Sequence, residues 1–188
     1  MARESRRGRL IVFRDAVVSD CVAVAALHAL SWRVAYRGIL AQDFLENNAE
    51  QDRVGVWRTR LTAAPPERQL VRVAVEDDQL VGFGCAFLDE DERWGALLDN
   101  LHVHPDYKGR GVGRQLMAHV AAWVLDRRPS SALHLWVFEE NHPARRFYER
   151  LGGTAVERVI HPAADGREVP SVRYMWHEPS ELITSKRF

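Results

Sequence analysis

The residues best suited to chemistry lie between positions 96 and 116, where a short apolar run precedes a loop rich in glycine. The run, residues 97–103, contains three leucines and a valine. His104-Pro105-Asp106 ends it, because the residue before a proline is pushed towards extended geometry and aspartate suits a turn. Three alternating glycines at 109–113 then lead into good helix formers. The pattern predicts a strand, a glycine loop and the start of a helix.

This loop has the features of an anion-binding site. Residues without Cβ let successive backbone N–H groups turn towards one point, and the first helical turn adds unpaired donors and the positive end of its dipole. Lys108, Arg110 and Arg114 add formal charge, which favours a phosphate or pyrophosphate. Both common nucleotide motifs fail, because Arg114 stands where G-x-G-x-x-G needs its third glycine and where the Walker loop needs its lysine. A glycine loop without a ligand is the alternative.

Two motifs together carry a resemblance to a known family. Lys108-Gly109-Arg110-Gly111-Val112-Gly113 is similar to the [Q/R]-x-x-G-x-[G/A] loop of the GNAT superfamily of N-acetyltransferases, with lysine in place of the usual glutamine or arginine. The sequence from Asn141 to Gly152 resembles the second motif of that family, an asparagine, a small residue and then Phe-Tyr-Glu-x-Leu-Gly. The resemblance covers about residues 9 to 177 and is close from 96 to 154.

The resemblance implies transfer of an acetyl group from acetyl-coenzyme A to a primary amine. In the family, the strands that correspond to 97–103 and 132–138 splay apart, and the pantetheine lies between them on backbone groups that no neighbouring strand pairs. The N–H of Leu101 or Val103 would face the thioester carbonyl, and the glycine loop would hold the pyrophosphate. The residues implied for coenzyme A binding are Leu101, His102, Val103, Lys108, Gly109, Arg110, Gly111, Val112, Gly113, Arg114, Asn141, Ala144, Phe147 and Tyr148.

Tyr148 is, by the same resemblance, the general acid. A tyrosine with a pKa near 10 can give a proton to the leaving thiolate of coenzyme A, whose thiol pKa is roughly 8.5 by analogy with cysteine, if it is held within about 3 Å. The alternative is packing beside Phe147 and Leu151, which lie four residues apart on one helix face. Asn141 would bond to the pantetheine or cap this helix, and the two roles can coexist.

At the position where the family pattern has its general base, this chain differs. Many relatives have glutamate where this chain has Leu97, and leucine cannot accept a proton. Strand alternation places Asp99 on the same face as Leu97 and places Asn100, His102 and His104 on the other. Asp99 or His102 acting through a water molecule is the hypothesis, and polar residues on a half-exposed strand are the alternative.

The acceptor is expected to enter opposite the coenzyme, lined by the first two helices, the 89–95 loop and the last hairpin. Trp32, Tyr36 and Asp99 are the candidate acceptor-binding residues. Further candidates to attract a cationic amine are Asp43, Phe44, Glu46 and the acidic run 89–92. A solvated turn for the acidic run and core packing for the two aromatic residues are the alternatives. A small amine, an aminoglycoside, an amino acid and a protein N-terminus all remain open as acceptors.

The elements around these residues predict one α/β domain over residues 9–178, with a disordered basic tail at 1–8 and a C-terminal tail at 179–188. A strand near 10–13 is followed by helices at 20–36 and 42–61, the second ended by Pro65-Pro66. Strands at 70–76, 80–88 and 97–103 pair antiparallel, and a helix at 113–127 then forces strand 132–138 to pair parallel. A short helix and a hairpin, 156–160 with 171–176, follow. We predict a GNAT fold, with a mixed, mostly antiparallel sheet of six or seven strands splayed at the central parallel pair and helices on both faces.

Composition excludes several function classes. Lysine plus arginine and aspartate plus glutamate both number 26, so the zero net charge does not favour a nucleic-acid partner. Cys21 and Cys85 are far apart, which argues against a zinc site or a disulfide scaffold, and no metal is expected. We see no apolar run that would span a membrane and expect a cytoplasmic protein.

The resemblance is compatible with a homodimer. Besides the enzyme, two alternatives are a catalytically weak regulatory domain that binds coenzyme A and an interaction domain without a cofactor.

Overall fold

A computed structural model describes residues 10–63 and 67–184 and places seven strands in one sheet. The order is β1-β2-β3-β4-β5-β7-β6, and every neighbouring pair is antiparallel except β4 and β5, which are parallel. The predicted mixed sheet is confirmed. The strands are β1 (Val12–Asp15), β2 (Gln69–Glu76), β3 (Gln79–Asp91), β4 (Gly95–Val103), β5 (Leu133–Phe138), β6 (Thr154–Pro162) and β7 (Glu168–Trp176).

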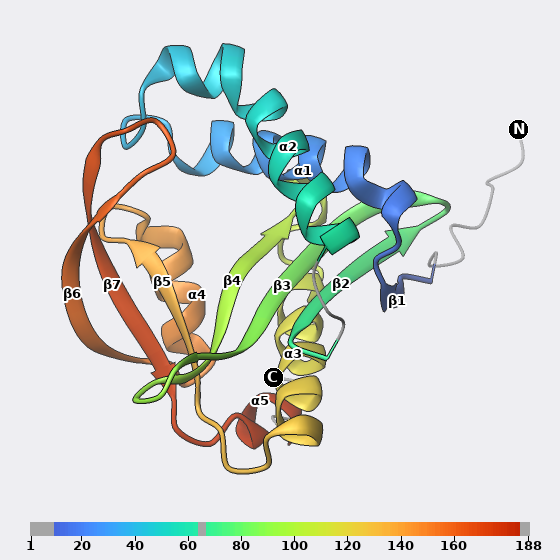
Figure 1. Ribbon diagram of the computed structural model, residues 1–188, viewed down its shortest axis with the longest axis vertical. Helices are drawn as coiled ribbons and strands as arrows, with labels where there is room; N and C mark the ends of the chain where they lie inside the picture. The colour runs from blue at the N-terminus through green and yellow to red at the C-terminus, as the bar shows by residue number, and fades with distance from the viewer. Residues whose placement is uncertain (1–9, 64–66, 185–188) are drawn as a thin grey trace, which may run out of the picture.

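Helices cover both faces of this sheet, as predicted (Figure 1). One face carries α1 and α2, and the other carries α3 and α4, so the molecule has three layers. A π-helical segment, η2 (Phe44–Asn48), leads into α2, and a short α5 packs against α3 near the C-terminus. The helices are α1 (Cys21–Ala35), α2 (Ala49–Ala63), α3 (Val112–Arg127), α4 (His142–Arg150) and α5 (Ser180–Thr184).

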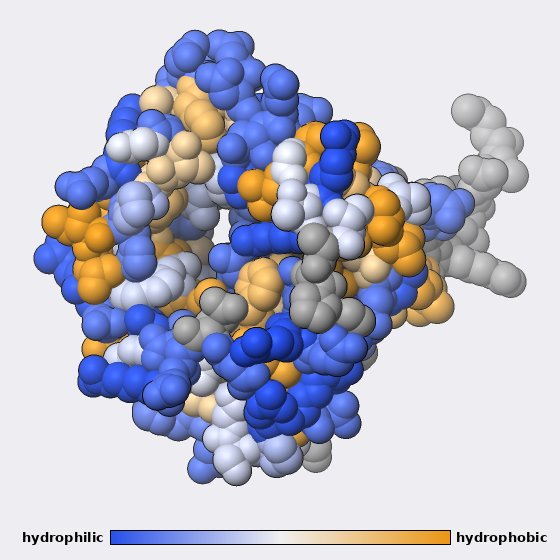
Figure 2. All heavy atoms as spheres, viewed as in Figure 1, coloured by the Kyte–Doolittle hydropathy of each residue, from blue (hydrophilic) through white to orange (hydrophobic). Residues whose placement is uncertain are grey.

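The sheet splits in the middle. β4 and β5 pair only at Ala96 with Leu133 and at Leu97 with His134, and beyond these two positions the strands diverge. β5 continues its antiparallel ladder with β7 on its other side. The face in Figure 2 shows a hollow between α1 and α2 and the β6–β7 hairpin.

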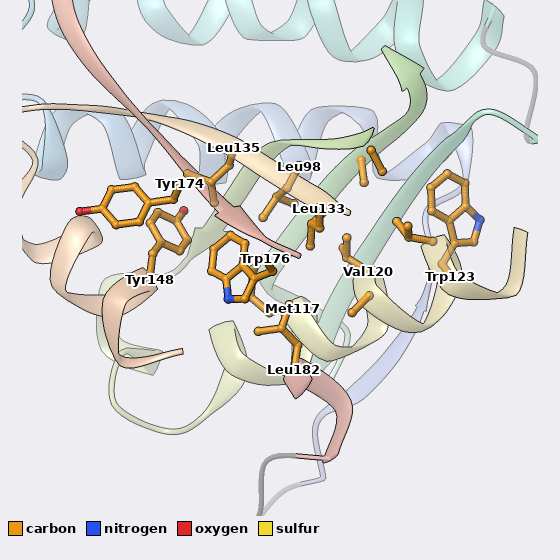
Figure 3. Close-up of a cluster of buried hydrophobic side chains, with 14 of the residues drawn as sticks. Leu98, Met117, Val120, Trp123, Leu133, Leu135, Tyr148, Tyr174, Trp176 and Leu182 are labelled. Atoms are coloured by element: carbon orange, nitrogen blue, oxygen red, sulfur yellow. The ribbon is translucent and has the colours of Figure 1, made fainter. Parts of the chain in front are cut away.

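The larger core lies between the sheet and α3 (Figure 3). Met117 and Val120 of α3 are fully buried against Leu98 of β4 and Leu133 of β5. Burying one such side chain contributes about 1.5–3 kcal/mol. Trp176 of β7 lies in the same cluster, between Tyr148 of α4 and Met117 of α3. This packing fixes α3, and therefore the glycine loop that precedes it, against both halves of the split sheet.

Strand β4 contains a bulge, and this corrects one expectation from the sequence. Cys85 pairs with Asn100 but Ala86 pairs with Leu98, so Asp99 is the extra residue. A bulge reverses the alternation of faces. Leu97, Asn100 and His102 therefore share the face that α1 and α2 cover, as their β3 partners show: Phe87, Cys85 and Phe83. Strict alternation had placed Leu97 opposite His102.

Other boundaries also differ from the sequence prediction. Residues 89–91, expected in a loop, extend β3, although Asp89 has a left-handed φ of 58° that interrupts the pairing. Ser180–Thr184, expected in the C-terminal tail, form α5, and its Leu182 is buried against α3. The basic tail at 1–8 and Pro65-Pro66 lie outside the described residues.

One segment of the described residues is apolar over a membrane-spanning length. Val18–Ala35, which is α1 with the three residues before it, is long and apolar enough to cross a membrane by length and composition alone. Of this segment, 44% is buried inside the molecule, where Val24 and Ala25 pack in one cluster with Val73 and Phe83 of the sheet. Val18, Val22 and Val34 are exposed.

Candidate functional site

A cleft of about 810 Å³ lies where β4 and β5 separate. Its walls come from α1, β4, the glycine loop, β5, α4 and the ends of β6 and β7. The structure brings together most of the residues that the sequence predicted; Arg110 and the further acceptor candidates Asp43, Phe44, Glu46 and 89–92 are not in the lining. The predicted residues that line the cleft are Trp32, Tyr36, Asp99, Leu101, His102, Val103, Lys108, Gly109, Gly111, Val112, Gly113, Arg114, Asn141, Ala144, Phe147 and Tyr148.

The strand edges that face each other across the cleft offer backbone hydrogen-bonding groups. The N–H of His104 donates to the carbonyl of Val81 on β3 at 2.9 Å. Because N–H groups two residues apart point the same way along a strand, those of Leu101 and Val103 point to the opposite edge, into the gap beside β5. Backbone groups at such an edge need a partner. A ligand with amide groups can supply it.

The glycine loop leaves open space where side chains would otherwise stand. Gly109 and Gly111 have φ of 76° and 83°, a conformation that glycine adopts without strain. A Cβ at Gly109 would meet nothing within 4 Å, and one at Gly111 would meet only the Gln115 amide, at 3.9 Å. The first bond of α3 runs from the N–H of Gln115 to the carbonyl of Gly111 at 3.0 Å. The amides of Val112 and Gly113, in the first turn of α3, precede this bond and are placed to meet an anion.

A buried carboxylate holds this loop from behind. Glu76, at the end of β2, is 5% exposed and accepts hydrogen bonds from the Tyr107 hydroxyl at 2.7 Å and from Arg110 at 2.8 Å. Arg110 also stacks on the Tyr107 ring, 4.3 Å from its centroid. The guanidinium of Arg110 is thus turned away from the cleft and anchors the loop to the β2–β3 hairpin. Nothing in the sequence motif pointed to Glu76, because the contact joins residues 34 apart.

Helix α4 brings Tyr148 and Asn141 to the cleft. The Asn141 side chain accepts from the N–H of Ala144 at 3.4 Å, so the predicted N-cap is confirmed. Tyr148 is buried among Phe147, Tyr174 and Trp176. Burial raises the pKa of its phenol above the usual value, and nearby Tyr36 adds to this effect. Tyr148 therefore stays protonated at neutral pH and is available as a donor.

The two candidate bases lie on the α1 and α2 side of the bulge. Arg60 of α2 donates to the Asp99 carboxylate at 2.6 Å and to the Asn100 side chain at 2.7 Å. His102 packs its ring 4.3 Å from that of His28, between centroids. Desolvation, with Arg53 and Lys108 nearby, lowers the pKa of His102 to about 3. His102 is therefore a neutral imidazole on the cleft wall, whereas Asp99 is already paired.

The acidic residues 43, 46 and 89–92, which were expected to attract an amine, do not line the cleft. Asp89 pairs with Arg128 at 2.8 Å and with Arg68 at 3.6 Å. Asp43 accepts from Asn47, and Glu46 from Gln42. Among the described residues, the lining of the cleft includes one carboxylate, that of Asp99. Phe44 packs near the Trp32 ring, with centroids 6.2 Å apart, and does not line the cleft.

These features fit a ligand with an anionic end and an amide-bearing chain. The open glycine loop suits the anion, and the gap between β4 and β5 suits the chain. Tyr148 and His102 lie on the cleft walls, where they can meet the reacting end. No group of three or more histidine, cysteine, aspartate or glutamate side chains in the described ranges is arranged to hold a metal ion.

Comparison with known proteins agrees with this geometry. Residues 22–153, more than half of the chain, match the family model described as "Acetyltransferase (GNAT) family". The uncharacterized N-acetyltransferase YuaI of Bacillus subtilis is 29% identical over 184 residues, covering 93% of this chain and 98% of that protein.

Two further similarities are informative. The [ribosomal protein bS18]-alanine N-acetyltransferase of Escherichia coli is 34% identical over 104 residues, covering 54% of this chain and 68% of that protein. The crystal structure of PaiA N-acetyltransferase from Thermoplasma acidophilum in complex with coenzyme A superposes with a TM-score of 0.66 at 17% identity, covering 86% of this chain and 98% of that one. At that identity the likeness shows the fold alone.

Proposed function

Because the chain belongs to the acetyltransferase (GNAT) family, we propose that it moves the acetyl group of acetyl-coenzyme A to a primary amine by direct attack of the amine. The observation that carries the proposal is the gap between β4 and β5, which has free strand edges, the glycine loop at one end and Tyr148 on its wall. When bound, acetyl-coenzyme A supplies an activated acetyl thioester. The work of the protein is then to position the two reactants and to handle charge and protons.

The donor half of the cleft would hold the coenzyme through backbone groups. The amides at the start of α3 and the positive end of its dipole would hold the pyrophosphate, with Lys108 and Arg114 adding charge. Arg110 acts indirectly in this proposal, because Glu76 holds it. Leu101 and Val103 would direct their N–H groups at the thioester carbonyl, where they stabilise the negative charge that develops during attack.

Proton transfers are assigned to Tyr148 and to a base acting through water. The raised pKa of Tyr148 keeps its proton available for the departing thiolate. His102 is the better placed of the two base candidates, since it is neutral and lines the cleft, whereas Asp99 is held by Arg60. With a pKa of about 3, His102 is too weak a base to deprotonate an alkylammonium ion, so the amine would attack in its neutral form. The N-protonated amide that is left when the C–S bond breaks is acidic enough to pass its proton through water to His102.

An acetyl-transfer assay tests the proposal. Purified protein is incubated with acetyl-coenzyme A and a panel of primary amines, and both free thiol and acetylated amine are measured. We expect amine-dependent release of coenzyme A in equal amount to the acetylated product. Selective binding of acetyl-coenzyme A without turnover of any amine would support the second candidate, a regulatory domain that binds coenzyme A. The specific observation in favour of that candidate is Leu97 at the position of the usual glutamate.

A further inference from the structure

The part of the cleft opposite the glycine loop, which we term the acceptor chamber, is lined by aromatic rings. Tyr36, directly after α1, meets Phe138 of β5 with ring centroids 4.8 Å apart. Trp136 of β5 meets His161 of β6 edge to face at 4.4 Å. Trp32 completes the wall one helical turn before Tyr36. All five residues line the cleft: Trp32 is in α1, Tyr36 follows it, Trp136 and Phe138 are in β5, and His161 is in β6.

Among the residues that the structure describes, the acceptor chamber offers a second ammonium group no unpaired carboxylate, and arginines already stack on two of its rings. Within the described residues, Asp99 is the only carboxylate on the cleft lining, and Arg60 already pairs with it at 2.6 Å. Two further cations lie next to the aromatic rings: Arg53 is 4.4 Å from the Trp32 centroid and Arg173 is 4.3 Å from that of Trp136. Moving a charged ammonium from water into such surroundings without a partner is costly. An acceptor with several ammonium groups is therefore disfavoured.

A bridge joins two walls of the chamber beside Tyr36 and Phe138, which pack in one cluster with Ile39 and Ala163. The β6–β7 hairpin reaches the connection that follows α1, as Figure 1 shows. Asp165 of the hairpin, with a side chain 1% exposed, accepts from the N–H of Ala41 at 2.7 Å. Arg167 donates to the carbonyl of Ile39 at 3.3 Å. A long chain laid between these two walls would have to break the bridge, so the space suits a compact acceptor.

From these three observations we infer that the acceptor is a compact monoamine whose amino group is carried on an aromatic or other apolar body, which packs against Tyr36, Trp136 and Phe138. The inference rests on the proposed acetyl transfer and specifies its second substrate. A polyamine, an aminoglycoside and a peptide N-terminus are the competing acceptors.

Matched amines test the inference in the same thiol-release assay. 2-Phenylethylamine and hexylamine represent the predicted class. 1,6-Diaminohexane differs from hexylamine by one added amino group, and spermidine and a pentapeptide with N-terminal alanine represent the competitors. We expect kcat/KM for each monoamine to exceed that for the diamine and the peptide by about 10- to 100-fold, since burying an aliphatic or aromatic body and leaving no ammonium unpaired both favour it.

Variants tie the preference to the chamber. Phe138→Ala and Trp136→Ala should raise KM for 2-phenylethylamine about tenfold while leaving acetyl-coenzyme A binding, measured by calorimetry, within threefold. Ile160→Ala is the control, because Ile160 is 65% exposed on β6 and does not line the cleft. Retained binding of acetyl-coenzyme A shows that each variant is folded.

The outcomes separate this inference from the proposed function. Faster turnover of the diamine, spermidine or the peptide would overturn the inference and leave the acetyl transfer intact. Binding of acetyl-coenzyme A without turnover of either monoamine would also overturn it. Failure to bind acetyl-coenzyme A at all would instead overturn the proposed function.

Discussion

At the scale of single residues, the environment of each side chain decides what chemistry it can do. Tyr148 keeps its proton because burial raises its pKa, and His102 loses its proton because burial lowers its pKa. The same physical cause thus leaves one group as a donor and the other as an acceptor on one cleft. Leu97, at the position where the resemblance implies a glutamate, has no group that can accept a proton.

Replacing Tyr148 by phenylalanine removes the proton donor with little change in shape. We predict a fall in kcat of about 10²- to 10⁴-fold, the usual contribution of a general acid. The dissociation constant of acetyl-coenzyme A should change by less than threefold. Tyr174→Phe is the control, since Tyr174 lies 6.1 Å from Tyr148 between ring centroids but does not line the cleft. Equal kcat for the Tyr148 variant and the wild type would remove Tyr148 from the mechanism.

The candidate bases differ in what they are already bonded to, so their variants should behave differently. His102→Gln is expected to lower kcat/KM at least tenfold across the pH range, because it removes a neutral acceptor from the cleft wall. Asp99→Asn should have a smaller effect, because Arg60 already engages that carboxylate. The measurement is kcat/KM against pH for both variants. Profiles identical to wild type in both would exclude the water-mediated base at these positions.

At the scale of elements, the glycine loop works because neighbouring elements hold it. Gly82 of β3 lets α3 approach closely: a Cβ there would lie 3.0 Å from Val112 and 3.2 Å from Leu116. Gly113 does the same between α3 and α4, where a Cβ would lie 3.3 Å from Phe147. Glu76 fixes the other end of the loop through Arg110 and Tyr107.

Glu76→Gln therefore tests the support of the loop without touching the cleft. Loss of the charged bond to Arg110 should raise KM for acetyl-coenzyme A about three- to tenfold with kcat within twofold, because the loop is then less ordered before binding. It should also lower the free energy of unfolding by about 1–3 kcal/mol. Glu168→Gln, an exposed glutamate at the start of β7, is the matched control. A fall in kcat with unchanged KM would contradict the positioning role.

Sequence patterns predicted the elements better than the contacts between them. Glycines and a helix-forming stretch signal the loop and α3 locally, and alternating residues signal the hairpin. The bulge at Asp99 depends on the register of β3 against β4, which local patterns do not encode. The pairing of Arg60 with Asp99 and of Arg110 with Glu76 joins residues more than 30 positions apart. Charge at these positions was visible in the sequence, but its partners were not.

At the scale of the whole molecule, the fold divides the cleft between two chemical environments. The donor end presents backbone amides, Lys108 and Arg114, and the acceptor chamber presents aromatic rings. The α1–α2 face also buries several histidines in neutral form. His28 is fully buried and accepts from the Trp57 indole at 3.0 Å. Desolvation lowers the pKa of His28 well below its usual value.

The lowered pKa values of the buried histidines lead to a prediction of how the free energy of unfolding depends on pH. His28, His102 and His134 all have lowered pKa values in the folded protein, about 3 for His102 and about 4 for His134, so protons bind preferentially to the unfolded chain. Stability should be fully present above about pH 6.5 and should fall as the pH drops towards 4, by up to about 1.4 kcal/mol per pH unit for each histidine.

Urea denaturation between pH 4.5 and 7.5 measures this dependence. His102→Phe keeps a ring against His28 and removes one titrating group, so its free energy of unfolding should decline less steeply than that of the wild type. His177→Gln, at an exposed position after β7, should leave the slope unchanged. Equal slopes for the wild type and the His102 variant would show that this histidine titrates normally in the folded protein.

The most direct test of the central claim is calorimetric titration with acetyl-coenzyme A, beside ATP and NAD as controls, of the wild type, Gly109→Asp and Gly166→Asp. Both glycines have positive φ, 76° and 82°, and open space at the Cβ position, so the backbone strain of the two substitutions is matched. Only Gly109 lies in the glycine loop. We expect selective binding of acetyl-coenzyme A that Gly109→Asp weakens at least tenfold and Gly166→Asp leaves unchanged. No binding by the wild type, or equal binding by both variants, would contradict it.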